Sequence, residues 1–70
     1  MRAHLTVTAN GTPVEVPEGS SVEDLLTLLE LGGRWVLVER NGEPVARAAL
    51  ATTPLADGDR LELVRAVAGG

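Results

Sequence analysis

One stretch, SSVEDLLTLLELGG at residues 20–33, is the only long run of the sequence with a helical pattern, and it constrains the possible folds more than any other. Ser20 and Glu23 have the spacing of a capping box, and Gly32 suits the left-handed position that ends a helix. Four apolar residues follow the i, i+3, i+4, i+7 spacing of one buried stripe: Val22, Leu25, Leu26 and Leu29. We therefore predict one short helix over residues 21–31.

A predicted β-hairpin precedes this helix. Residues 4–9, HLTVTA, alternate with period two, which places three apolar side chains on one face: Leu5, Val7 and Ala9. Asn10-Gly11 follows, and this pair favours a type I′ turn because both positions need a positive φ. Residues 12–16 return as a second strand. Pro13 has no N–H to donate, so we expect this second strand at an edge of the sheet.

Three further strands are predicted after the helix. Residues 34–39, RWVLVE, have an unbroken apolar centre, typical of a central strand covered on at least one face. After an Asn-Gly turn, residues 43–46 form a short fourth strand, and residues 47–59 read as a loop with one helical turn. Residues 60–67, RLELVRAV, alternate as a fifth strand with Leu61 and Leu63 on one face.

These elements predict an α+β domain over residues 1–68, in which a mixed sheet of four or five strands packs on one helix. The order is compatible with the β-grasp arrangement, in which the first and last strands lie side by side in parallel. The pattern of residues alone leaves that strand order open.

Composition excludes several kinds of function. The chain has no cysteine and one histidine, which removes thiolate nucleophiles and most zinc sites. His4 is on the polar side of a strand without an obvious partner, so we expect it to be exposed and without a role. Asp57 and Asp59 have the spacing that begins an EF-hand but lack its other ligands, which favours a tight turn. We predict no metal site and no enzyme activity.

Net charge and the first ten residues indicate the cellular location of the protein and the partners that are not expected. Its net charge is −4 and its six arginines are spread along the sequence, so nucleic acid is not an expected partner. The first ten residues alternate in polarity, and we expect neither a signal peptide nor a membrane span. These features favour a cytoplasmic protein that is monomeric when free.

The final residues, AVAGG, suggest a chemical role. Glycine is a poor strand residue, so something other than folding is a possible reason for Gly69 and Gly70. A carboxylate at Gly70 could enter a channel too narrow for any Cβ, and residues 66–70 could reach about 16 Å when extended. Adenylation by ATP would give this carboxylate a leaving group, so the chain would be the substrate of another enzyme. The alternative is a frayed two-residue tail without function.

The chain resembles the thiamine-biosynthesis sulfur carriers, the ThiS family of small ubiquitin-like β-grasp proteins. The similar pieces are the first Asn-Gly turn, VPEGSSVEDLL, VLVERNG followed by PVARAAL, and LADGDRLELVRAVAGG. The resemblance implies that a ThiF-type enzyme adenylates Gly70 with ATP and magnesium and that Gly69 helps to thread the tail. It also implies that a cysteine desulfurase provides the sulfur of a thiocarboxylate, which thiazole synthase (ThiG-type) receives. No cofactor would be bound by the chain itself.

The sequence departs from many relatives at its tryptophan. They carry tryptophan where this chain has Leu50, and its only tryptophan is Trp35. If Val36 and Val38 face the core, Trp35 and Leu37 face the opposite side and could bind a partner, because interface cores are enriched in tryptophan. The more ordinary alternative is that a loop covers Trp35.

Two other functions remain open from the sequence. Carriers for molybdopterin synthesis or tRNA thiolation share this fold and the terminal glycines. A β-grasp binding module without tail chemistry is the second alternative. A residue added after Gly70 would separate these classes, because only a carrier needs the free glycine carboxylate.

Overall fold

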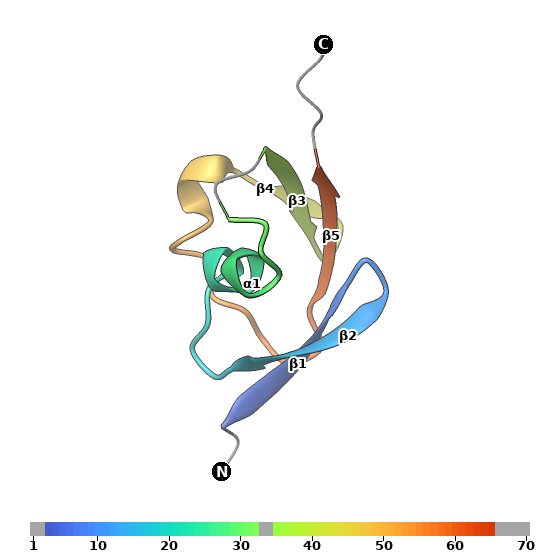
Figure 1. Cartoon of the computed structure of the whole chain (residues 1–70), viewed down its shortest axis with the longest axis vertical. Coiled ribbons are helices and arrows are strands. Elements are labelled where there is room, and N and C mark those ends of the chain that lie inside the picture. Colours follow the sequence, from blue (N-terminus) through green and yellow to red (C-terminus); the bar gives the residue numbers. More distant parts are fainter. Residues whose placement is uncertain (1–2, 33–34, 66–70) are drawn as a thin grey trace.

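The computed structural model describes residues 3–32 and 35–65 of the 70-residue chain. Its described elements are β1 (His4–Ala9), β2 (Thr12–Pro17), α1 (Val22–Leu28), β3 (Val36–Arg40), β4 (Glu43–Val45), a 3₁₀ turn (Arg47–Ala49) and β5 (Arg60–Arg65). The five strands form one sheet in the order β2-β1-β5-β3-β4, and α1 covers one face of it (Figure 1). The predicted α+β class and the edge position of β2 are confirmed.

The centre of the sheet is a parallel pair. Thr8 of β1 lies beside Arg60 of β5, whereas the other neighbouring strands run antiparallel. Such a pair needs a crossover connection, and the segment that contains α1 belongs to it. This is the ubiquitin-like β-grasp arrangement, which the strand pattern alone left open.

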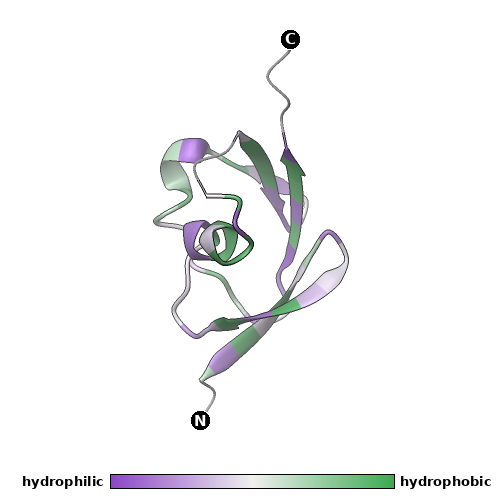
Figure 2. Ribbon diagram, viewed as in Figure 1, coloured by the Kyte–Doolittle hydropathy of each residue, from purple (hydrophilic) through white to green (hydrophobic). Residues whose placement is uncertain are grey.

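The core lies between α1 and the facing side of the sheet. Polar and apolar residues alternate along β1 and β5, so that each strand turns one apolar row toward the helix (Figure 2). The largest fully buried side chains are Leu25, Leu61, Val7, Val16 and Val22. The predicted inward positions on the first and fifth strands are therefore confirmed, as is the buried stripe of the helix, of which Leu29 is only partly buried.

Both Asn-Gly turns have the expected backbone. Asn10 and Gly11 have φ values of 51° and 84°, and Asn41 and Gly42 have values of 53° and 86°. Two successive positive φ angles match a type I′ turn and the right-handed twist of a hairpin. The loop after β4 contains one 3₁₀ turn, as predicted.

The start of α1 is one residue later than predicted. The N-cap is Ser21, whose Oγ accepts a hydrogen bond from the Asp24 N–H (3.1 Å), while the Asp24 carboxylate accepts one from the Ser21 N–H (2.8 Å). The Oγ of Ser20 is buried and donates to the Pro17 carbonyl (2.6 Å) instead. Adjacent serines offered two capping registers, and burial of Ser20 left Ser21 as the cap.

The end of the helix also differs from the prediction. α1 ends at Leu28, and Glu30 takes the left-handed position with φ of 61°, where Gly32 was expected. The Leu31 N–H donates to the Leu26 carbonyl (2.7 Å), and the Glu30 N–H to the Thr27 carbonyl (3.0 Å), which is a Schellman ending. Leu31 is thereby partly buried against the core. The left-handed turn at Glu30 thus directs Leu31 toward the core.

Two predicted boundaries change or lie outside the described residues. β3 begins at Val36 rather than at residue 34, and it lies inside the sheet between β5 and β4, as expected. β5 is described to Arg65, so residues 66–67 of the predicted fifth strand are not covered. The proposed domain boundary between residues 68 and 69 also lies outside the described residues.

Candidate partner-binding face at the end of β5

β5 leads toward the terminal glycines, so its surroundings are the candidate site. Gly69 and Gly70 lie outside the described residues, and the structure neither supports nor contradicts their predicted role. The described part of the site consists of the contacts that hold β5 and the surface beside its last residues. These contacts decide which part of the strand can meet another protein.

The two turn asparagines hold β5 with their side chains. Asn10 Oδ1 accepts a hydrogen bond from the Leu63 N–H (2.8 Å), and Asn10 Nδ2 donates to the Leu63 carbonyl (3.0 Å). Asn41 Oδ1 accepts one from the Arg60 N–H (2.9 Å). Sequence reasoning explained both asparagines by positive φ alone. An aspartate would also tolerate the turn, but it could not donate to Leu63, so the choice of amide was the available signal.

Asp59 anchors the beginning of β5. Its carboxylate accepts hydrogen bonds from Arg40 Nε (2.8 Å), Asn41 Nδ2 (3.0 Å) and the Ala56 N–H (2.8 Å). Burial by itself raises the pKa of Asp59, but these three hydrogen bonds and the charge of Arg40 together outweigh burial and lower that pKa. The side chain is only 7% exposed, so it works as an internal connection between the β3–β4 turn and the start of β5.

The neighbouring Asp57 belongs to the tight turn predicted for this segment. Its Oδ1 accepts a hydrogen bond from the Thr6 N–H (2.8 Å), and Gly58 has φ of 88°. His4 is exposed, as expected. Among residues 3–32 and 35–65, no group of three histidine, cysteine or acidic side chains could hold a metal ion.

An apolar area lies on part of the face of the sheet that is turned away from α1. We define the outer patch as Trp35, Leu37, Pro44 and Val64. Trp35 is 66% exposed, Leu37 65% and Val64 58%, and Leu37 lies directly opposite Val64 across β3 and β5. A shallow hollow of about 380 Å³ lies over β3 and β4 on this face. Both predicted partner residues, Trp35 and Leu37, are therefore exposed on one face.

Arg47 is the side chain that meets Trp35 from the 3₁₀ turn. Its guanidinium carbon is 5.0 Å from the centre of the Trp35 ring, a distance that allows a cation–π interaction. The expectation that a loop covers Trp35 is wrong, because two thirds of the residue stays exposed. The short 3₁₀ turn brings one arginine over the ring but no apolar cover.

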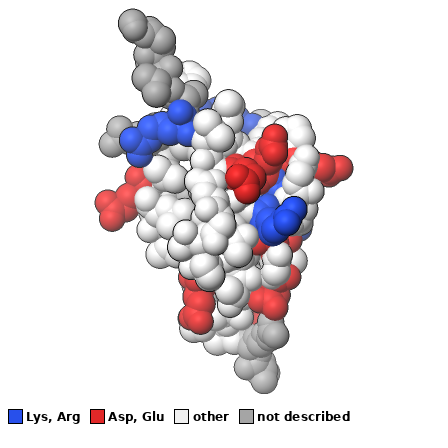
Figure 3. Space-filling view, turned by 90° about the vertical axis from the view of Figure 1, so that its right-hand side faces the viewer, with Lys and Arg blue, Asp and Glu red and all other residues white. Residues whose placement is uncertain are grey.

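Charged side chains border this side of the molecule. Figure 3 shows a central area without charged side chains, with basic side chains toward its upper end, acidic ones along both borders and the lower end, and further basic side chains beside the acidic ones on the right-hand border. A centre depleted of charged residues with a polar rim is the usual anatomy of a protein-binding surface.

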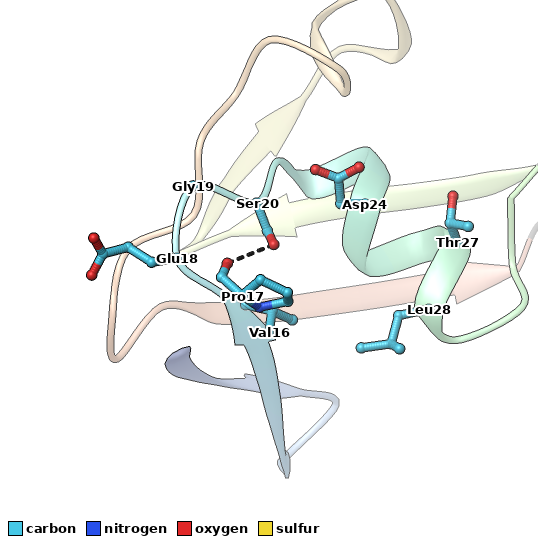
Figure 4. Close-up of a pocket in the computed structure, with 8 residues that line it drawn as sticks. All are labelled: Val16, Pro17, Glu18, Gly19, Ser20, Asp24, Thr27 and Leu28. Atoms are coloured by element: carbon cyan, nitrogen blue, oxygen red, sulfur yellow. Dashed lines mark hydrogen bonds between the residues drawn. The ribbon is translucent and has the colours of Figure 1, made fainter. Parts of the chain in front are cut away.

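A second hollow, of about 490 Å³, lies between the end of β2 and α1 (Figure 4). Leu28 points toward Val16 and Pro17 there, whereas Glu18 points away. The Asp24 carboxylate at its rim is used in the helix cap. No acid, base and nucleophile converge among these lining residues, so the hollow offers no catalytic constellation.

The described helix does not have the length and apolar character needed to cross a membrane.

The sheet order, the parallel central pair and the one α-helix among the described residues define a ubiquitin-like β-grasp protein. The model of the ThiS family matches residues 4–70, and the chain belongs to that family. The crystal structure of a thiamine biosynthesis protein (ThiS) from Geobacter metallireducens is 36% identical, with a TM-score of 0.79 over 94% of this chain and all of that one. SAMP1 from Haloferax volcanii is 25% identical with a TM-score of 0.61, over 96% of this chain and 99% of that one.

The chain is also similar to a thiazole synthase of Paramagnetospirillum magneticum. The two are 39% identical over 61 residues, which are 87% of this chain and 19% of that protein. The chain therefore spans about a fifth of that relative's length. A ThiS-like segment thus occurs within a longer protein that is named thiazole synthase.

Proposed function

We propose that this protein is the sulfur carrier for formation of the thiazole ring of thiamine, with the carboxylate of Gly70 as its reactive group. The observation that carries the proposal is the match to the ThiS family over residues 4–70, which includes the Gly69-Gly70 end. The similarity to a thiazole synthase supports the same pathway. In this proposal the chain is a substrate protein and not an enzyme.

The chemistry needs an activating partner. A ThiF-type enzyme with ATP and magnesium would join the Gly70 carboxylate to the α-phosphate, with pyrophosphate as leaving group. A persulfide formed by a cysteine desulfurase would then attack the carbonyl carbon and displace AMP. A thiol would cleave the resulting sulfur–sulfur bond and leave a thiocarboxylate, which a ThiG-type thiazole synthase would accept. This chain supplies no acid or base to these steps.

The outer patch is the proposed docking surface for the activating enzyme. It lies on the outer face of the sheet and includes Val64, the second-last described residue of the strand that leads to the tail. Trp35 and Leu37 would be buried on binding, and tryptophan is prominent among residues that dominate binding energy. Asp59, Asn10 and Asn41 would hold β5 in place while the tail enters the partner.

A related carrier for molybdopterin synthesis or tRNA thiolation is the second candidate, because the proposed tail chemistry would be the same. The acceptor protein distinguishes the two. Sulfur transfer to thiazole synthase supports the first, and transfer only to another acceptor supports the second.

The test is to incubate the protein with a ThiF-type enzyme, ATP, magnesium, a cysteine desulfurase, cysteine and a thiol reductant. Mass spectrometry of the isolated C-terminal fragment then shows whether one oxygen of Gly70 has become sulfur. Isolation of the fragment is necessary, because oxidation of Met1 gives nearly the same mass change. The matched control carries one alanine after Gly70 and should remain unmodified.

A thiocarboxylate confined to Gly70 is the expected result. An unchanged carboxylate, with the same enzymes active on another ThiS protein, would contradict the proposal and favour a β-grasp binding module.

A further inference from the structure

On the edge strand β2, prolines occupy positions whose backbone groups face away from β1. The Thr8 N–H donates to the Asp59 carbonyl (2.9 Å), so Thr8 and alternate residues of β1 face β5. The residues of β2 opposite Thr8 and His4 are Pro13 and Pro17, whose backbones therefore face away from the sheet. Proline cannot donate a hydrogen bond, so this edge resists the addition of another strand.

The β4 edge has the same protection. The Asn41 N–H donates to the Arg60 carbonyl (2.8 Å), so Arg60 and the alternate residue Glu62 face β3. Glu39, opposite Glu62, uses its backbone toward β5. Pro44 lies opposite Glu39 on the other side, and its backbone therefore points outward. Both outer edges of the sheet thus carry proline at outward positions.

β5 has an open edge of a different kind. β1 turns away at Gly11, and the side chain of Asn10 pairs with the N–H and carbonyl of Leu63 in place of a strand residue. The next residue of β5 that faces this side is Arg65. Within the described part of the chain, nothing pairs with the backbone N–H or carbonyl of Arg65. In Figure 1 the end of β5 extends beyond the hairpin of β1 and β2.

We propose that the backbone of Arg65 is a docking edge to which an extended segment of the adenylating enzyme adds as a strand. Addition of a strand to an open edge is a common way to bind an extended segment, because main-chain hydrogen bonds supply affinity. Asn10 has two roles in this arrangement: it completes the pairing of β1 with β5 and it ends that pairing before Arg65.

The position of the edge identifies its occupant. This step rests on the proposed function, in which Gly70 enters the active site of the adenylating enzyme. Arg65 is five residues from Gly70, at most about 18 Å along an extended chain. The protein that surrounds the tail therefore has to pass close to Arg65. The exposed Val64 beside it adds apolar contact for the same partner.

Two variants distinguish the contribution of the Arg65 main chain to binding from that of the Arg65 side chain. Arg65→Pro removes the outward N–H and places a ring where a partner strand would lie, whereas Arg65→Ala removes only the side chain. Because the N–H of Arg65 faces away from β3, the proline should not break the β3–β5 pairing. Glu15→Pro is the matched control, because it removes an outward N–H from the β2 edge.

Affinity for a ThiF-type enzyme is then measured by calorimetry for each protein. We expect Arg65→Pro to bind at least about tenfold more weakly than Arg65→Ala, and Glu15→Pro to bind like the wild type. Equal affinity of Arg65→Pro and Arg65→Ala would overturn the proposal. Amide exchange of wild-type Arg65 gives an independent reading that needs no variant, and the expected result is slower exchange in the complex.

A separate assay of ATP–pyrophosphate exchange keeps the two proposals distinguishable. Binding without exchange would contradict the proposed tail chemistry but leave the comparison of variants valid. Exchange with an unprotected Arg65 amide would contradict the docking edge alone. A wild-type dimer that Arg65→Pro abolishes would make a second copy of this chain the occupant and overturn the assignment to the enzyme. No binding by the wild type would overturn both proposals.

Discussion

The two ends of β5 differ although they belong to one six-residue strand. Asp59, just before the strand, is buried and accepts three hydrogen bonds from Arg40, Asn41 and Ala56. Arg65, at the other end, is exposed and has an open backbone edge next to the exposed Val64. The comparison indicates that stability is concentrated where the strand begins and that the strand end is left available for binding. Variants at the two ends should therefore change different measurements.

The largest effect is expected from Asp59→Ala. Removal of this carboxylate leaves the guanidinium of Arg40, the amide of Asn41 and the N–H of Ala56 without their partner. We expect the free energy of unfolding to fall by about 2–4 kcal/mol, because partly buried polar groups lose charge-assisted hydrogen bonds. Urea denaturation measures the change. A loss below about 0.5 kcal/mol would show that this end of the strand is not the stable one.

Trp35→Ala tests the surface beside the other end of β5, because Trp35 directly precedes Val36, which lies opposite Arg65. Because Trp35 is 66% exposed, the melting temperature should change little. The free energy of binding to the activating enzyme should become less favourable by about 2 kcal/mol if Trp35 is a binding anchor. Calorimetry of the complex measures the affinity, and Leu28→Ala is the control because Leu28 is also exposed but lies on α1, away from the outer patch. Unchanged affinity would remove Trp35 from the proposed interface.

Asn10→Gly separates the contribution of the Asn10 side chain to stability from that of the turn backbone. Glycine accepts the positive φ of this turn, so the change removes mainly the two hydrogen bonds to Leu63. The expected loss of stability is about 1–2 kcal/mol, measured by thermal or urea unfolding. A neutral result would mean that Asn10 is required only for the shape of the turn.

The smallest effect is a dependence on pH. The pKa of Asp59 is lowered in the folded protein, so its contribution is complete above the pKa of the unfolded chain, about 3.9. As the pH falls through the folded pKa, this contribution is lost. The difference in unfolding free energy between the wild type and Asp59→Asn should therefore stay constant above about pH 5 and shrink as the pH falls below about 4. A constant difference would contradict the lowered pKa.

Much of the local structure could be predicted from residues near one another in sequence. Asn10-Gly11 required two positive φ angles, and the alternation of Leu5 and Val7 set the inward face of β1. The helix was recognised, but both of its ends were misplaced. Ser20 and Ser21 compete for the cap, and the packing of Leu31 ends the helix early, so each boundary depends on burial and not on propensity.

The candidate site could be predicted only in part. The alternation of β3 placed Trp35 and Leu37 on one face, but it did not predict that Trp35 would stay exposed, and the role of the terminal glycines stays a prediction. The contact between Arg47 and Trp35 could not be predicted, because it depends on where the 3₁₀ turn lies over the sheet. The open edge at Arg65 could not be predicted either, because it exists only once the length of β1 beside β5 is known.

The sequence by itself determined the strand faces, the turns and the presence of α1, because periodicity and φ preferences are properties of neighbouring residues. The family was indicated separately, by the resemblance of several motifs to ThiS proteins. The tertiary structure decided how β5 is held and where it is free. Asn10 and Leu63 are 53 residues apart, and Arg40 and Asp59 are 19 apart. Contacts between such distant residues form only when β5 pairs with β1 on one side and with β3 on the other, so no local pattern encodes them.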